Sequence, residues 1–365
     1  MVVKIGSSTV VGADGKVNRA FIGGLADQAA ALRKLGWRLV VVSSGAIACG
    51  YPVLGFDRKP VGDLPSLQAC ASAGQCIISS AYDEEFHARD LLSSLVLLTR
   101  HDTARRASYL HARDALLRLV ELGVVPVVNE NDTVTVDEIK FGDNDTLAAL
   151  VSCLVSADLC VTLSDIDGLY TANPSVDPTA TLIPEVTQVD RSISAVAGDS
   201  SSSFGTGGMS SKVRAARGMM AAGIPTVICE GRRPRVLLDV AEGKSVGTRF
   251  QPPADATPEA GRKLWIGLAE VVHGTIELDE GAATAVLGRG ASILPVGVSR
   301  VEGTFEAGEV VNVTNPAGEL IGRGVVGYSS DDMLRVRGLK LEVIARFLGE
   351  AAAVPAVHRD ELLVL

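Results

Sequence analysis

The sequence predicts an α/β protein, a three-layer sandwich around a mostly parallel sheet, followed by a small β-rich domain. Three observations lead to this prediction. Short runs of Val, Leu and Ile alternate with segments whose apolar residues recur at helical spacing. Hydrophobic residues make up 47% of the chain but aromatic residues only 4%, so the core is aliphatic. Thirty-eight glycines in 365 residues supply the many tight turns that such an alternation needs.

The net charge and the cysteine content indicate which kinds of partner and which cellular compartment suit this chain. The formal net charge of −9 argues against a general nucleic-acid surface, because phosphate binding needs a basic footprint. The six cysteines form no CxxC pair and lie mostly among apolar neighbours, as buried free thiols do in a reducing compartment. The sequence shows no signal peptide and no long apolar span, so we expect a cytoplasmic protein.

The first element is expected at residues 1–5, an apolar strand interrupted by Lys4 and followed by Gly6-Ser7-Ser8. A lysine at the end of a strand, before a turn of small residues, can direct its ammonium group at a phosphate. Lysines also protect the edges of sheets, so an edge strand is the alternative. Either reading places a strand at the N-terminus.

The same order of strand, small polar loop and helix recurs after one helix. That helix is capped by Asn18 and closed by Gly36, and the next strand covers residues 38–42. Ser43-Ser44-Gly45 follows it and can hold a carboxylate or phosphate, or can be an ordinary tight turn. Three further elements are expected, namely a helix at 66–82, a strand at 95–98 and a helix at 108–122.

The most informative stretch begins with the strand Val124–Val128, which runs directly into Asn129-Glu130-Asn131-Asp132. Asp143-Asn144-Asp145 then precedes the apolar run 147–155, which reads as a helix. Turn formation and helix capping are the ordinary roles of such residues. However, polar side chains at the carboxyl end of a strand, facing a helix start, mark the usual ligand position of an open α/β sheet.

Two later loops also follow this pattern. The strand 159–163 ends in Ser164-Asp165, which can hold an adenine or ribose or form a common Asp-Gly turn. The loop 200–212, rich in Gly and Ser, leads through Lys212 into the helix 213–222. Backbone N–H groups, hydroxyls and an ammonium group would meet at this helix start, where an anion is favoured. The alternative is a simple linker, and the P-loop pattern is absent.

The strand 226–228 is expected to close the sheet, and 236–241 forms a last helix. The domain boundaries expected from composition are a first domain at 1–250, a linker at 251–263, a β-rich domain at 264–353 and a tail at 354–365. Within the β-rich domain, strands are expected at 275–278, 293–298, 310–314 and 319–326.

The residue types point to phosphoryl transfer. No His or Cys accompanies the polar loops, whereas Lys4 and Lys212 lie at strand ends or helix entries beside glycine-containing loops. Two ammonium groups together with Mg²⁺ would reduce the repulsion between a carboxylate acceptor and the γ-phosphate, and the acceptor, already ionised at pH 7, would need no general base. Asp145 or Asp143 could hold the lysines. The residues alone therefore indicate a nucleotide-dependent kinase of a small anionic molecule.

At these positions the chain resembles the glutamate 5-kinase family of the amino-acid kinase superfamily, whose members carry a C-terminal PUA domain. The motifs that carry the resemblance are 3–8 (VKIGSS), 43–48 (SSGAIA), 129–132 (NEND), 142–145 (GDND), 164–165 (SD) and 205–212 (GTGGMSSK), with Trp265, 279–282 (DEGA), 294–297 (LPVG), 323–324 (RG) and 356–360 (AVHRD). One departure is Ser164, which keeps a hydroxyl where the family often has threonine.

The resemblance implies an eight-stranded, mostly parallel sheet that binds ATP and L-glutamate across the carboxyl ends of its strands. It also implies synthesis of L-glutamyl 5-phosphate, the first step of proline biosynthesis, with feedback inhibition by proline. Mg²⁺ would be the metal cofactor. A homo-oligomer, dimer or tetramer, is expected, and glutamyl phosphate reductase is a candidate partner.

The resemblance also assigns roles to residues. Lys4, Lys212 and Asp145 would be catalytic, with Asp145 organising the two lysines. Ser44, Asn129, Asp132 and Asn144 would hold glutamate, with Asp132 meeting its α-ammonium group. The ATP-binding residues would be Lys4, Ser164, Asp165, Thr206, Gly207, Gly208, Met209, Ser210, Ser211 and Lys212.

Two alternative functions are retained. An acetylglutamate kinase or aspartokinase would share the fold, but an N-acetylated substrate has no ammonium group for Asp132, and the PUA-like part argues against both. RNA binding through the PUA-like part is the alternative from another class, and the acidic net charge makes it secondary.

Overall fold

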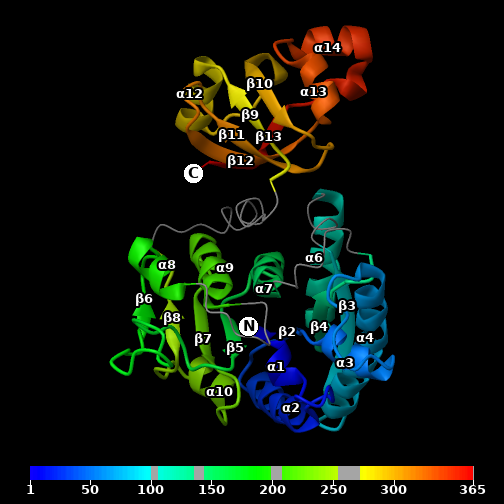
Figure 1. Ribbon diagram of the computed structural model, residues 1–365, viewed down its shortest axis with the longest axis vertical. Coiled ribbons are helices and arrows are strands. Elements are labelled where there is room, and N and C mark those ends of the chain that lie inside the picture. The colour runs from blue at the N-terminus through cyan, green and yellow to red at the C-terminus, as the bar shows by residue number, and fades with distance from the viewer. Residues whose placement is uncertain (100–105, 135–143, 199–207, 254–271, 365) are drawn as a thin grey trace. The chain divides into compact units, whose positions relative to one another are not determined.

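A computed structural model of the chain describes residues 1–99, 106–134, 144–198, 208–253 and 272–364. The chain divides into two compact units, Met1–Gly261 and Arg262–Leu365 (Figure 1). Each unit has its own sheet. None of the helices in the described ranges is long and apolar enough to cross a membrane.

The first unit is built on an eight-stranded sheet in the order β3-β4-β2-β1-β5-β7-β8-β6. The paired strands run parallel except for β7 and β8, which confirms the mostly parallel sheet. The strands are β1 (Val2–Ile5), β2 (Val40–Val42), β3 (Leu92–Leu98), β4 (Val124–Glu130), β5 (Cys160–Ser164), β6 (Glu185–Val186), β7 (Thr226–Glu230) and β8 (Thr248–Phe250).

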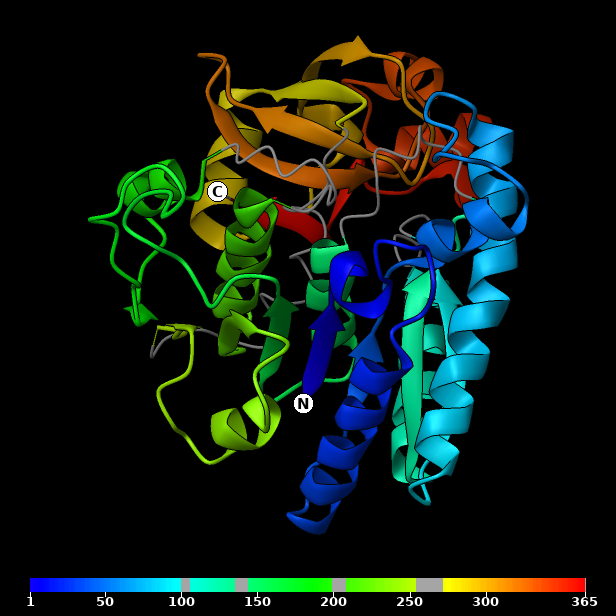
Figure 2. The same cartoon turned by 60° about the horizontal axis from the view of Figure 1, so that its bottom comes forward.

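Helices cover both faces of this sheet, as Figures 1 and 2 show from two sides. Against one face lie α2 (Arg19–Lys34), α3 (Ala46–Val53), α4 (Leu64–His87) and α10 (Val236–Ala241). Against the other lie α6 (Arg106–Glu121), α7 (Asn144–Leu154) and α9 (Met209–Ala221), with α8 (Arg191–Ala197) beside α9. The short α1 (Ser7–Val10) follows β1. This is the predicted three-layer α/β sandwich.

Two expectations about this sheet are wrong. The strand at 226–228 does not close the sheet, because β8 and β6 continue it; both are too short to leave a readable period in the sequence. Lys4 does not protect an edge, because β1 lies between β2 and β5 in the middle of the sheet.

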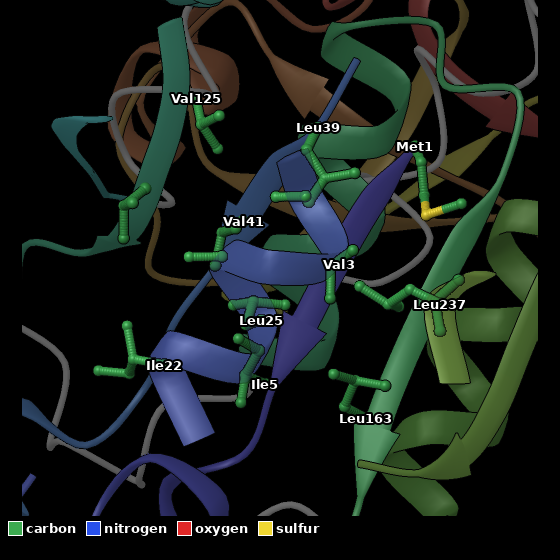
Figure 3. Packing of buried hydrophobic residues seen from close by; sticks show 14 of the residues in the cluster. Met1, Val3, Ile5, Ile22, Leu25, Leu39, Val41, Val125, Leu163 and Leu237 are labelled. Atoms are coloured by element: carbon green, nitrogen blue, oxygen red, sulfur yellow. The ribbon is translucent and has the colours of Figure 1, made fainter. Parts of the chain in front are cut away.

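The alternation of side chains along β1 decides where Lys4 points. Val3 and Ile5 enter the main core, where Figure 3 shows them against Ile22 and Leu25 of α2. Successive side chains of a strand point to opposite faces, so Lys4 points to the other face, against which α7 packs. Its side chain is buried there, only 6% exposed. A buried ammonium group needs a partner, and that partner lies in α7.

Capping residues fix the helix starts expected from the sequence. Asn18 accepts a hydrogen bond from the Phe21 N–H (3.1 Å) at the start of α2, and the chain leaves this helix through Gly36 at φ 86°. Asp63 caps α4 in the same way, three residues before the helix start that we expected.

Helices α3 and α4 cross with their backbones in close contact. A Cβ atom on Gly50 would lie 1.8 Å from the Cys70 carbonyl oxygen, and one on Gly74 would lie 1.8 Å from the Ala46 carbonyl oxygen. Neither position can hold any side chain without moving backbone. Gly74 is therefore needed for the packing of α4 against α3, and Gln75 is the next residue of α4.

The second unit is built on a five-stranded sheet in the order β10-β9-β11-β12-β13. The strands are β9 (Gly274–Leu278), β10 (Val298–Gly303), β11 (Val310–Thr314), β12 (Leu320–Val326) and β13 (Val357–Val364). The helices are α12 (Glu280–Arg289), α13 (Ser330–Val336) and α14 (Leu341–Leu348), with single turns at Pro295–Gly297 and Glu350–Ala352.

The sequence reading of this unit differs from the structure in two places. The run 293–298, expected as a strand, contains the 3₁₀ turn at Pro295, a residue that has no N–H to give to a sheet, and β10 begins only at Val298. The residues expected as a tail, 354–365, contain β13, which pairs with β12. Its side chains Val357 and Leu362 lie in the core of the unit.

Candidate active site

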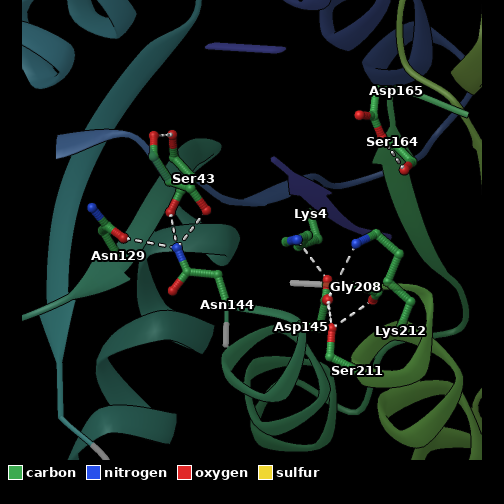
Figure 4. A network of polar contacts seen from close by, with 11 residues as sticks. Lys4, Ser43, Asn129, Asn144, Asp145, Ser164, Asp165, Gly208, Ser211 and Lys212 are labelled. Carbon is green, nitrogen blue, oxygen red and sulfur yellow. Dashed lines mark hydrogen bonds and ion pairs between the residues drawn. The ribbon is translucent and has the colours of Figure 1, made fainter. Parts of the chain in front are cut away.

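Polar side chains gather in the first unit where the carboxyl ends of β1, β2, β4 and β5 meet the starts of α7 and α9. Figure 4 shows two groups there, one charged and one made of neutral amides and hydroxyls. The first two residues of α7 supply one member to each group, Asn144 to the neutral group and Asp145 to the charged group. This is the position at which open α/β sheets bind ligands.

The charged cluster consists of Lys4, Asp145, Ser211 and Lys212. Asp145 lies between the two lysines (Figure 4), with Lys4 Nζ 2.5 Å from its Oδ1 and Lys212 Nζ 3.5 Å from its Oδ2. The Ser211 hydroxyl donates to Asp145 Oδ2 at 2.6 Å. All three charged side chains are at most 9% exposed. One carboxylate thus holds two ammonium groups that come from different elements.

Electrostatics keeps Asp145 ionised. Its burial alone would raise the pKa of the carboxyl, but Lys4 and Lys212, together with the hydrogen bonds from Lys4 and Ser211, lower that pKa to about 2. The pKa of Lys212 is lowered, first by burial and further by the like charge of Lys4, against the opposing effect of Asp145. The cluster carries a net charge of +1 once the two lysines and one carboxylate are summed. It can therefore attract an anion.

The neutral cluster, which we call the amide cluster, consists of Ser43, Ser44, Gln75, Asn129 and Asn144. Asn144 Nδ2 donates to the Ser43 carbonyl oxygen (2.7 Å), to Ser44 Oγ (2.6 Å) and to Asn129 Oδ1 (3.1 Å). Asn129 Nδ2 donates to Gln75 Oε1 at 2.7 Å. These hydrogen bonds join four elements: the end of β2, the end of β4, the start of α7 and the middle of α4.

Two polar atoms of the amide cluster lack a partner among the described residues. These are Asn144 Oδ1, an acceptor, and Gln75 Nε2, a donor, and both are buried. Buried polar groups are nearly always hydrogen-bonded, so unpartnered ones in a cluster of this kind indicate a place for a polar ligand or water. An acceptor and a donor in one cluster fit a molecule that has both an ammonium group and a carboxylate.

Asp132 lies on the turn after β4 and is half-buried. Burial, together with the nearby charge of Glu130 and against the opposing charge of Lys59, raises the pKa of its carboxyl to about 7. The pKa of Lys59 is itself lowered to about 8, mainly by burial. Asp132 is therefore a carboxyl whose charge changes near neutral pH.

The remaining predicted residues lie on the nucleotide side. Ser164 is buried at the end of β5 and its hydroxyl donates to the exposed carboxylate of Asp165 (3.1 Å). Gly208 precedes α9, and Met209, Ser210, Ser211 and Lys212 form its first turn, where the N–H groups and the helix dipole favour an anion. Thr206, Gly207 and Asp143 lie outside the described residues.

Sequence reasoning missed two residues of this site, Gln75 and Lys59, which were not among the predicted site residues. Ser211 was predicted for ATP binding, but its hydrogen bond to Asp145 was not. A buried glutamine next to a glycine in an otherwise apolar stretch of helix was the available signal for Gln75.

The described residues contain no group of three or more His, Cys, Asp or Glu side chains that could hold a metal ion by itself. Both carboxylate oxygens of Asp145 already face cations or a hydroxyl. The carboxylate of Asp165, next to Ser164, is exposed and could bind a metal ion. A single carboxylate is sufficient for Mg²⁺ bound with a nucleotide, because Mg²⁺ is commonly held there by one or two carboxylates and by the phosphates themselves.

Comparisons with known proteins identify the family of this chain. Residues 1–230 match the amino acid kinase family, and residues 274–348 match the PUA domain. A protein of Geobacter sp. (strain M21) named glutamate 5-kinase is 44% identical over 365 residues, which cover all of this chain and 97% of that protein. Proteins of the same name from Gloeobacter violaceus and Salmonella arizonae are also 44% identical, over all of this chain and 99% and 98% of their own lengths.

Proposed function

We propose that this chain, which belongs to the amino acid kinase family and within it to the glutamate 5-kinases, transfers the γ-phosphoryl group of ATP to the γ-carboxylate of L-glutamate. The products would be L-glutamyl 5-phosphate and ADP, in the first step of proline biosynthesis. The observation that carries the proposal is the buried Lys4–Asp145–Lys212 cluster directly beside the amide cluster. The first suits a transferring phosphoryl group and the second a small polar acceptor.

Charge neutralisation is the main task of the protein in this reaction. The γ-carboxylate of glutamate is ionised at pH 7, so it attacks the γ-phosphorus without a general base. Two like-charged groups must approach each other, and Lys4 and Lys212 would stabilise the charge on the oxygens of the phosphoryl group during transfer. Asp145 would keep both ammonium groups in place before ATP arrives, so that little reorganisation is needed in the transition state.

The amide cluster would bind the amino acid. Asn144 Nδ2 donates to Ser44 Oγ, so the Ser44 hydroxyl hydrogen is left to donate to a carboxylate of the substrate. Asn144 Oδ1 and Asp132 would accept from the α-ammonium group. Asn129 would hold Asn144 in this orientation. An N-acetylated acceptor would lose the interaction with Asp132.

The nucleotide would lie along Ser164, Asp165 and the segment from Thr206 to Lys212. The start of α9 offers N–H groups to the phosphates, and Asp165 would be a ligand of Mg²⁺ bound with them. The metal would neutralise charge on the phosphate oxygens.

Proline would act as the feedback inhibitor of such an enzyme. It shares the α-carboxylate and a cationic nitrogen with glutamate, so part of the amide cluster and Asp132 could recognise it. We therefore expect proline to raise the apparent KM for glutamate without changing the KM for ATP.

The test is ATP- and Mg²⁺-dependent formation of an acyl hydroxamate in the presence of hydroxylamine. L-Glutamate, N-acetyl-L-glutamate and L-aspartate are compared at equal concentrations, with and without proline. Product with L-glutamate alone supports the proposal. Product with N-acetyl-L-glutamate or L-aspartate instead would move the substrate to one of the two retained alternatives, and no product with any of them would contradict the assignment as an amino-acid kinase.

A further inference from the structure

Gln75 is a polar residue in the buried middle of α4 that the proposed reaction does not yet use. It is 8% exposed and accepts a hydrogen bond from Asn129, which is itself 2% exposed. Its Nε2 is buried and has no partner among the described residues. A glutamine in this position costs free energy unless both ends of its amide are used.

Two backbone groups fix the orientation of every amide in the cluster. The Glu130 N–H can only donate, and it donates to Asn129 Oδ1 at 2.9 Å. Asn129 Nδ2 must therefore point away and donate, which requires the acceptor Oε1 of Gln75 at that end. At the other end the Ser43 carbonyl can only accept, so Asn144 must offer its Nδ2 there. The unpartnered atoms are thus a true donor on Gln75 and a true acceptor on Asn144.

The hydrogen bond between Asn129 and Asn144 is the weakest of those that connect the amide cluster. Asn144 Nδ2 has two hydrogens but three acceptors within reach, and the one on Asn129 is the most distant, at 3.1 Å against 2.6 and 2.7 Å. The orientation of Asn129 therefore depends on its other two partners, the Glu130 N–H and Gln75 Oε1. Of these only Gln75 is a side chain that a substitution can remove.

We propose that Gln75 positions the amino-acid acceptor together with Asn129: its Oε1 holds the Asn129 amide, and Asn129 in turn fixes the Gln75 amide in the orientation that leaves its Nε2–H as a donor for a carboxylate of the acceptor. This inference rests on the proposed function, because it assumes that the amide cluster binds the acceptor. α4 presents Gln75 at this point because Gly74 lets the helix lie directly against α3, which begins two residues after Ser44.

The first test is a double-mutant cycle with the full chain. Gln75→Met keeps the volume but removes both hydrogen-bonding ends, and we expect it to raise the KM for glutamate about tenfold. The KM for ATP and kcat should stay within about twofold, as for lost ground-state positioning. Adding Gln75→Met to Asn129→Ala should change little, because the two residues act as one unit. Gln68→Met, two helical turns earlier on α4, is the matched control and should leave both KM values unchanged.

The second test separates positioning from packing. Gln75→Glu has the same shape, and when protonated it can still accept from Asn129 and donate through its O–H. When ionised it has no donor and repels an anionic acceptor. We therefore expect the ratio of its glutamate KM to that of the wild type to grow as pH rises, with ADP release as the measured signal. A residue that only fills space would give a ratio independent of pH.

The outcomes distinguish this inference from the proposed function. Thermal unfolding with and without glutamate accompanies each assay, so binding is measured apart from turnover. Wild-type protein that neither turns over glutamate nor is stabilised by it would overturn both proposals. Active wild-type protein with an unchanged glutamate KM in Gln75→Met, an additive double variant, or a pH-independent ratio in Gln75→Glu would overturn the role of Gln75 alone. If Gln75→Met does not fold, the pH ratio of Gln75→Glu decides.

Discussion

The charged cluster and the amide cluster start from neighbouring residues of one helix, Asp145 and Asn144, yet they are built in opposite ways. Three charges make up the first, and they meet through contacts that any rotation of an ammonium group can satisfy. The second carries no charge, and each of its amides has one permitted orientation. Charges act over distance and with little direction, whereas amides recognise by direction. The site therefore divides two tasks between the clusters. The charged cluster would stabilise the charge that develops on the phosphoryl group, and the amide cluster would recognise the amino-acid acceptor.

Stability does not explain the charged cluster. Taking three charges out of water costs more than their attraction commonly returns, and buried ion pairs can often be replaced by apolar residues without loss. The core on the opposite face of the sheet is mainly aliphatic, and Figure 3 shows Val3 and Ile5 within it. A buried charged cluster that is costly for folding indicates a role in function.

The largest effect is expected for Asp145→Asn, which keeps the shape but leaves two buried ammonium groups without a counter-charge. Because both lysines lose their anchor, kcat should fall by at least roughly 10³. Removing one partner of a buried pair should also lower the free energy of unfolding by about 3–5 kcal/mol. Steady-state assays and urea denaturation measure the two effects, with Asp165→Asn as a control for stability. A kcat near that of the wild type would break the assignment of the charged cluster.

Lys212→Ala should come second, with kcat lower by roughly 10²–10³, the usual result of losing one charge-stabilising donor. The KM for glutamate should change little, since the amide cluster stays intact. Lys16→Ala, at an exposed lysine in the same unit, serves as control. An effect confined to the glutamate KM would show that the two clusters do not divide the work as proposed.

Asn144→Ala tests the other side of the comparison. It removes the acceptor Oδ1 and the donor that joins Ser44 to Asn129, so the KM for glutamate should rise roughly tenfold or more. The KM for ATP should stay close to that of the wild type. Loss of kcat with an unaltered glutamate KM would mean that Asn144 serves the charged cluster next to it.

The smallest effect concerns the pH dependence of glutamate binding. The pKa of Asp132 is raised to about 7, so its carboxyl is protonated, and unable to attract an ammonium group, at higher pH than an ordinary aspartate. The KM for glutamate should therefore rise severalfold as pH falls through about 7. Asp132→Asn should show a high KM without this dependence. Lys59→Met should move the rise to higher pH, because the charge of Lys59 lowers the pKa of Asp132. A flat wild-type profile would contradict the role of Asp132.

Most of the site was predictable because its residues lie where strands end. Lys4, Asn129 and Ser164 come directly after apolar residues, and Ser44 comes one residue later, after Ser43. A parallel sheet brings the carboxyl ends of its strands to one edge without further information. Asn144, Asp145 and Lys212 were predictable as helix starts that face this edge. Local patterns thus identify a residue whenever the fold itself determines its position.

Residues that reach the site from the middle of an element were not predictable. Gln75 lies inside a 24-residue helix, and only the crossing of α3 and α4 turns it toward Asn129. The sheet edge was misjudged for a related reason, since β6 and β8, of two and three residues, are held by pairing and not by a pattern of their own. Both depend on contacts between distant parts of the chain.

The crossing at Gly50 and Gly74 has a consequence for how this protein tolerates change. Neither glycine belongs to the charged or the amide cluster, yet a methyl group on either would meet a backbone oxygen of the opposite helix at 1.8 Å. In a library of single substitutions selected for activity, both positions should be as depleted as the lysines, and alanine should be no better than larger residues. Selection would thus mark two helix-packing positions as if they were part of the chemistry, and only a measurement of folding would tell them apart.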